Sequence, residues 1–80
     1  MNNPTAAMIV IGDEILSGRT RDSNMHYLAK ELVKIGIGLQ EVRIVSDVEN
    51  KIIFAVNELK KKFNYVFTSG GIGPTHDDIT

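Results

Sequence analysis

The stretch that decides the fold reads Tyr65-Val66-Phe67-Thr68-Ser69-Gly70-Gly71-Ile72-Gly73-Pro74-Thr75-His76-Asp77-Asp78. An apolar run leads into three glycines, and then come a Pro-Thr step and two adjacent carboxylates. This order predicts a buried strand, a tight loop with exposed backbone N–H groups, and the first turn of a helix. Such a junction binds anions, so we expect a phosphate at the loop. Because Asp77 and Asp78 would repel a phosphate, a divalent cation such as Mg²⁺ is expected between them.

Two further strands are expected before this stretch. Residues 6–11 form a short apolar run that stops at Gly12, which suits a strand covered on both faces. Residues 39–45 mix apolar and charged side chains, which indicates a less protected or edge strand. With helices between them, the strands form a β-α-β-α-β pattern whose right-handed crossovers make the sheet parallel. The predicted fold class is therefore α/β, in three layers with a mainly parallel sheet.

The two helices are predicted from their apolar spacing and their end signals. The first follows a polar loop with Asp22 or Ser23 as N-cap, and Gly36 ends it in a left-handed C-cap. Its predicted buried stripe is Met25, Leu28, Ala29, Leu32 and Val33. The second begins with Ser46 or Asp47 as N-cap and ends at the lysines 60–62. Its predicted stripe is Ile52, Ile53, Val56, Leu59 and Phe63.

The glycine loop differs from the two commonest phosphate-binding motifs. A P-loop needs a lysine after its glycines, and no lysine follows here. A dinucleotide fold places its glycines after the first strand, whereas that turn is Gly12-Asp13-Glu14. We expect Gly70, Gly71 and Gly73 to hold a ligand phosphate, although glycines also serve tight turns without any ligand.

The polar candidates around the loop each have a structural alternative. Thr75 and Asp78 have the spacing of a capping box, whereas Asp77 has no such local duty and is the better candidate for metal or substrate. The other candidates are Asp13 and Glu14 after the first strand, Asn24 at the first helix, and Asp47 after the second strand. All of them could face the carboxyl ends of the strands, but a solvated loop explains Asp13 and Glu14, and helix capping explains Asn24 and Asp47.

Composition narrows the functional classes. The chain has 80 residues, 42% of them hydrophobic and 24% charged, which is ordinary for one small globular domain. A net charge of −1 predicts no nucleic-acid partner and no binding to an acidic membrane surface. The absence of cysteine excludes disulfides, thiolate metal sites and cysteine nucleophiles. The N-terminus has no signal-peptide pattern, so we expect a cytoplasmic protein; a homo-oligomer remains open.

These motifs resemble the molybdopterin-binding, MoaB/Mog-like domain, in the subtype of the competence/damage-inducible protein CinA. The resemblance rests on residues 12–18, on Asp22-Ser23-Asn24 where the pattern is more often Asp-Thr-Asn, and on the closing Gly-Gly-Ile-Gly-Pro-Thr-His-Asp-Asp motif. It implies a three-layer α/β/α domain that is usually about twice as long as this chain. Residues 1–80 are then expected to be its front part, cut short on the C-terminal side.

The resemblance also implies a chemistry. Relatives bind molybdopterin or a nucleotide-like ligand at the glycine loop, so that Gly70, Gly71, Gly73 and Thr75 would cradle phosphate. Asp78 and Asp47 match acidic positions of the family, and Asp77 is the extra acid of the CinA-like pattern. The CinA-like branch implies metal-dependent cleavage of the ADP-ribose pyrophosphate, and the molybdenum-cofactor branch implies adenylyl transfer to molybdopterin. A binding module without turnover and an inactive fragment are the alternatives.

Overall fold

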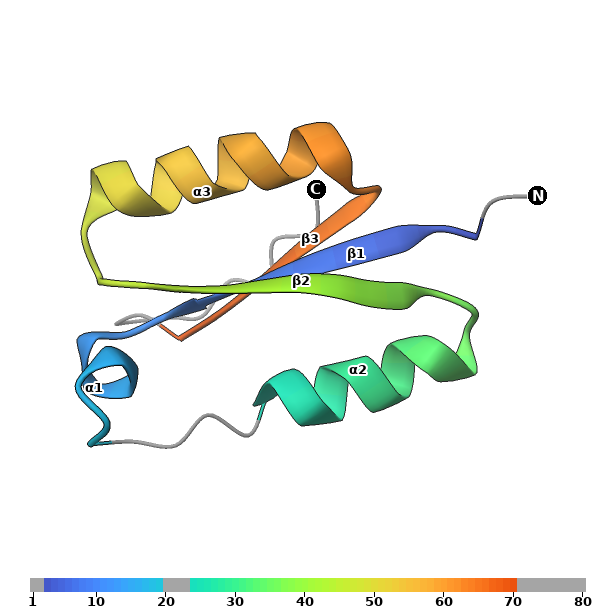
Figure 1. Cartoon of the computed structure of the whole chain (residues 1–80), viewed down its shortest axis with the longest axis horizontal. Coiled ribbons are helices and arrows are strands. Elements are labelled where there is room, and N and C mark those ends of the chain that lie inside the picture. The colour runs from blue at the N-terminus through green and yellow to red at the C-terminus, as the bar shows by residue number, and fades with distance from the viewer. Residues whose placement is uncertain (1–2, 20–23, 71–80) are drawn as a thin grey trace.

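The computed structural model describes residues 3–19 and 24–70. They form, in order, β1 (Thr5–Ile11), α1 (Asp13–Leu16), α2 (Asn24–Lys34), β2 (Gly38–Val45), α3 (Glu49–Lys62) and β3 (Tyr65–Gly70). β1 is the middle strand of a parallel sheet of order β2-β1-β3. The helix α3 covers one face of the sheet, and α1 and α2 lie on the other (Figure 1). The α/β class, the β-α-β-α-β order and the parallel sheet are thus confirmed.

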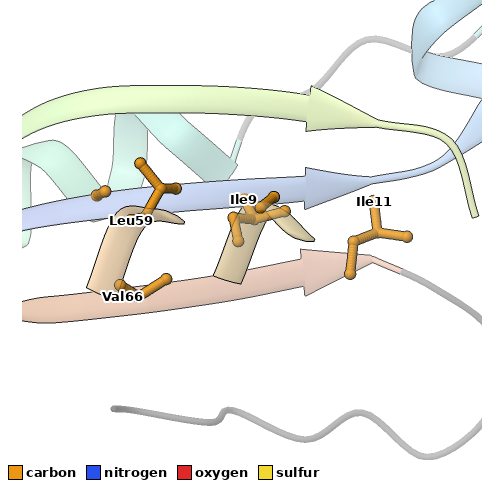
Figure 2. Close-up of a cluster of buried hydrophobic side chains, with 6 residues drawn as sticks. Ile9, Ile11, Leu59 and Val66 are labelled. Carbon is orange, nitrogen blue, oxygen red and sulfur yellow. The ribbon is translucent and has the colours of Figure 1, made fainter. Parts of the chain in front are cut away.

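The core lies between the middle of the sheet and α3. All residues of β1 from Ala6 to Ile11 are buried, as expected for an apolar strand covered on both faces. Figure 2 shows the buried cluster on the α3 side of the sheet, where Leu59 of α3 lies against β1 and β3. The cluster consists of Ala7, Ile9, Ile11, Ala55, Leu59 and Val66. Its burial fixes α3 on the sheet.

The C-terminal end of α2 and the position of β2 agree with the sequence. Gly36 has φ +81, and its N–H donates to the carbonyl of Val33 at 3.1 Å. The N–H of Ile37 donates to the carbonyl of Leu32 at 2.9 Å, which completes a Schellman motif. Every residue of β2 is half-buried or exposed, and the strand lies at the edge of the described sheet. The predicted C-cap and the edge position are therefore both confirmed.

The predicted helix stripes are only partly correct. In α2, Leu32 is buried and Leu28 and Ala29 are half-buried, but Met25 and Val33 are exposed. In α3, Ile53 is half exposed, although the rest of its predicted stripe is at least half-buried. Met25 and Val33 are exposed because α2 packs mainly on the edge strand β2, whose narrow surface covers only part of the helix. Despite these exposed apolar groups, no helix within residues 3–19 and 24–70 is long and apolar enough to cross a membrane.

Two local predictions are wrong. Asp13 and Glu14, expected in a turn with Gly12, instead begin the single helical turn α1. The N-cap of α3 is Val48 rather than Ser46 or Asp47, and no side chain caps the helix. The extended backbone of Val48, with φ −128 and ψ 125, starts the helix one residue later than a cap at Asp47 and two later than a cap at Ser46. The predicted caps of α2, Asp22 and Ser23, lie outside the described residues.

A charged network joins the edge strand to α3. The Arg43 Nε atom donates to Glu41 Oε2 at 2.8 Å, and the Nη1 atom donates to Glu58 Oε1 at 2.5 Å. These hydrogen bonds raise the pKa of Arg43 above its usual value. The hydrogen bond from Arg43 lowers the pKa of Glu58. Arg43 therefore links β2 to α3 through the carboxylate of Glu58.

We expect the contribution of Glu58 to stability to depend on pH. A carboxyl whose folded-state pKa is lowered stabilises the fold above its unfolded pKa, near 4.3, and this stabilisation is lost as the pH falls through the folded-state value. The free-energy difference between the parent chain and Glu58→Gln, from urea unfolding, should therefore shrink from pH 7 to pH 3. In an Arg43→Met background the same difference should vary much less with pH, because Arg43 is the largest cause of the lowered pKa of Glu58. An equal pH dependence in both backgrounds would show that Arg43 is not its cause.

Candidate functional site

The carboxyl ends of the three strands meet along one edge of the sheet, which we call the carboxyl rim. In the register, Ile11 is opposite Val45 on one side and Gly70 on the other, so β1, β2 and β3 end side by side. The Gly12 N–H donates to the carbonyl of Val45 at 3.0 Å and extends the pairing by one residue. Ligands of open parallel sheets bind outside this edge. The rim is therefore the place to look for the predicted site residues.

Gly70 is the first loop glycine and the last residue of β3. It has φ +88, which L side chains rarely adopt. A Cβ atom at Gly70 would collide with the carbonyl oxygen of Ile11 and lie 3.2 Å from its carbonyl carbon. Glycine is thus required here for the chain to leave the sheet beside β1, whether or not a ligand is bound. This is a structural reason for Gly70, additional to the predicted phosphate contact.

Two of the predicted acidic residues stand at the centre of the rim. Asp13 and Glu14 are exposed and form the first turn of α1, which begins directly after the middle strand. The Glu14 side chain folds back over Gly12, so that its Oε2 atom lies 3.0 Å from where a Cβ of Gly12 would be. Backbone hydrogen bonds hold the turn, including Ser17 N–H to the Asp13 carbonyl at 2.9 Å. The Glu14 carboxylate thus lies over the end of β1.

Asp47 follows β2, which ends beside β1, and Asn24 is the first residue of α2. Asp47 is exposed two residues after the end of β2, and its carboxylate has no hydrogen bond or ion pair with the described part of the chain. Because Asp47 does not cap α3, the capping alternative for it is removed. Asn24 is exposed as the first residue of α2, at the helix end nearer the rim (Figure 1). Asp47 is thus available for a ligand at the rim.

The acids of the described residues do not form a metal site by themselves. Within residues 3–19 and 24–70, no three His, Asp or Glu side chains gather closely enough to hold an ion. The predicted metal ligands Asp77 and Asp78 lie outside the described residues, as do Gly71, Gly73 and Thr75. Mg²⁺ is typically held by one or two carboxylates together with phosphate oxygens and water. A metal at the rim would therefore depend on Asp77, Asp78 and the ligand.

One hollow of the described surface lies at the opposite end of the sheet. It has a volume of about 770 Å³ and is lined by the start of β1, the start of β2 and the C-terminal end of α2. Its described lining carries no charged side chain, and Asn64 there hydrogen-bonds the backbone N–H of Thr5 at 2.9 Å. Ligands of parallel sheets bind at the other edge. We therefore place the site at the carboxyl rim rather than in this hollow.

One polar residue of the rim was not singled out by the sequence. Ser69 precedes Gly70 in β3, and its hydroxyl oxygen is buried without a hydrogen-bond partner. Sequence inspection could have noticed a hydroxyl at the junction of strand and glycine loop, but not its burial. The structure thus adds Ser69 to the candidates at the rim.

Comparison with known proteins gives a consistent assignment. Residues 7–80 match the family described as "Probable molybdopterin binding domain". The chain is 50% identical to "Probable FAD synthase" of Caenorhabditis briggsae over 76 residues, which are 95% of this chain and 14% of that protein. It is 43% identical to a "CinA-like protein" of Flavobacterium psychrophilum over 75 residues, 94% of this chain and 18% of that protein. The chain thus spans less than a fifth of the length of either relative.

A solved structure supports the same assignment. A crystal structure of the protein CinA from Thermoplasma acidophilum, described as having unknown function, superposes with a TM-score of 0.84 at 32% sequence identity. The superposition covers 94% of this chain and 44% of that chain. The resemblance drawn from the glycine motif and the fold class are both confirmed, and the chain belongs to the family of probable molybdopterin-binding domains.

Proposed function

We propose that this domain binds a phosphate-bearing small molecule, molybdopterin or an adenine nucleotide, at the carboxyl rim. One observation carries the proposal: the glycine loop leaves the sheet at Gly70, beside the turn that carries Glu14. Backbone N–H groups of such a loop and the start of the helix predicted after it suit an anion. Asp47, which does not cap α3, follows β2 on the other side of β1. Its carboxylate can accept hydrogen bonds from hydroxyl groups of the ligand.

The name of one relative and the CinA-like resemblance both favour an adenosine pyrophosphate as the ligand. FAD, which a "Probable FAD synthase" is named for making, contains adenosine joined through a pyrophosphate. ADP-ribose, the substrate implied by the CinA-like resemblance, contains the same adenosine pyrophosphate. The shared chemistry is thus an adenosine pyrophosphate, which matches a glycine loop beside carboxylates if a divalent cation accompanies it.

For the complete domain, the proposed reaction is metal-dependent hydrolysis of the ADP-ribose pyrophosphate. Water attacks one phosphorus, the bridging P–O bond breaks, and the products are AMP and ribose 5-phosphate. A bound divalent metal would polarise the phosphoryl oxygens. From this chain, Asp77 and Asp78 would hold the ion, and Gly70, Gly71, Gly73 and Thr75 would hold the phosphates. Adenylyl transfer is the second candidate, because the FAD synthase relatives of two Caenorhabditis species are 49% and 50% identical to this chain.

Binding of ADP-ribose to the chain, measured by calorimetry with and without Mg²⁺, tests the proposal. We expect binding that Mg²⁺ strengthens, and we expect the double variant Asp77→Asn/Asp78→Asn to lose about tenfold or more in affinity only when Mg²⁺ is present. Glu31→Gln is the control, because Glu31 pairs with Lys34 on the surface of α2 and should not affect binding.

Product analysis separates the functional alternatives. Release of AMP and ribose 5-phosphate supports the hydrolase, whereas release of pyrophosphate from ATP in the presence of FMN supports adenylyl transfer. Binding without product at Mg²⁺, Mn²⁺ or Co²⁺ would leave a binding module. A chain that unfolds cooperatively on heating but binds none of these compounds would contradict the proposal altogether.

A further inference from the structure

Ser69 carries a buried hydroxyl that the fold itself does not use. It is the only side-chain oxygen or nitrogen among the described residues, 3–19 and 24–70, that is buried without a hydrogen-bond partner. Polar groups removed from water are nearly always hydrogen-bonded, and an exception calls for an explanation. An alanine at this position would avoid the cost of burying the hydroxyl. Stability of the free chain therefore does not account for serine at position 69.

The position of Ser69 places this hydroxyl at the rim. In the register Ser69 is opposite Val10 of the middle strand, and Gly70 follows directly. Val66 faces α3 in the core cluster, so strand alternation directs Ser69 to the opposite face, which carries α1 and α2 (Figure 1). On that face Glu14 follows the neighbouring strand β1. The hydroxyl thus lies one residue from the glycine loop and on the side of the sheet where α1 begins.

The chemistry of a hydroxyl indicates the missing partner. The residue as a whole is half-buried, so a ligand at the rim can reach it. A phosphate oxygen can only accept hydrogen bonds, and a serine hydroxyl can donate one. We infer that the Ser69 hydroxyl donates a hydrogen bond to a phosphate oxygen of the ligand at the carboxyl rim. The inference rests on the proposed function and assigns a further ligand-binding group to the same site.

The test compares the stability of the free chain with its affinity for ADP-ribose. Ser69→Ala should raise the melting temperature of the ligand-free chain by about 4–8 °C, because an unsatisfied buried group is removed. The same variant should weaken the binding of ADP-ribose with Mg²⁺ about tenfold or more, because a hydrogen bond to a charged group is lost. Ser69→Thr retains the hydroxyl and should bind within about threefold of the parent chain.

Thr68→Val is the matched control, because it removes a hydroxyl from the adjacent residue on the opposite face of the strand. Its affinity for ADP-ribose should equal that of the parent. If Ser69→Ala binds as tightly as the parent, or is less stable than the parent without ligand, the inference is wrong. If the parent itself does not bind ADP-ribose, the proposed function fails instead, so the two failures are distinguishable.

Discussion

Leu59→Ala is expected to lower the free energy of unfolding by about 2–5 kcal/mol. Leu59 is fully buried and lies at the centre of the cluster between α3 and the sheet, against residues of both β1 and β3 (Figure 2). Truncation removes three carbon atoms, and the cavity cannot close without moving α3. A chain of 80 residues has a total stability of roughly 4–12 kcal/mol, so the loss is a large fraction of it.

Urea unfolding followed by circular dichroism measures this effect, and Ile53→Ala provides a control. Ile53 lies on the same helix, has an isomeric side chain and is 50% exposed. Its replacement should change the free energy of unfolding by less than about 1 kcal/mol. Equal losses for the two variants would show that α3 does not pack on the sheet through Leu59.

The sequence predicted the fold because its signals are local. The run from Ala6 to Ile11 is short and apolar at every position, which favours a strand covered on both faces, and it is the buried middle strand. Gly36 ends α2 because glycine adopts a positive φ without strain, and this backbone lets the N–H groups of Gly36 and Ile37 bond to the last carbonyls of the helix. These features follow from the residue and its immediate neighbours, so they can be recognised without knowing the packing.

The features that the sequence did not predict depend on distant parts of the chain. Val33 lies at helical spacing from the other apolar residues of α2, yet it is 69% exposed. The reason is that α2 packs on an edge strand, which cannot cover a wide stripe of side chains. Asp47 has the residue type of a cap, yet Val48 occupies the N-cap position. The Ser69 hydroxyl is buried only in the folded chain, where Ser69 is opposite Val10, 59 positions away in the sequence. For Gly71, Gly73, Thr75, Asp77 and Asp78 the site remains a prediction from the sequence.

Gly70→Ala is expected to lower the free energy of unfolding by about 2–5 kcal/mol. A left-handed backbone costs an L-residue about 1–2 kcal/mol, and forcing a methyl group into an occupied position adds about 1–3 kcal/mol. The occupied position is the Ile11 carbonyl, which cannot move without breaking the end of the β1–β3 pairing. Gly36→Ala is the control: Gly36 has φ +81 but no atom within 4 Å of the added Cβ, so it should show only the backbone cost. Equal losses in urea unfolding at the two positions would rule out the collision with Ile11.

Loss of ADP-ribose binding in Gly70→Ala would not by itself identify a phosphate contact, because the variant also distorts the rim. A D-alanine at position 70, introduced by chemical synthesis, separates the two roles of the glycine. A D-residue adopts a positive φ without strain, and its methyl group points away from the Ile11 carbonyl, so the stability should stay within about 1 kcal/mol of the parent. If the backbone of Gly70 approaches a phosphate closely, the methyl group should still weaken ADP-ribose binding about tenfold or more. A stable D-alanine variant that binds like the parent would mean that glycine at position 70 serves the turn alone, and that the phosphate is held by groups further along the loop.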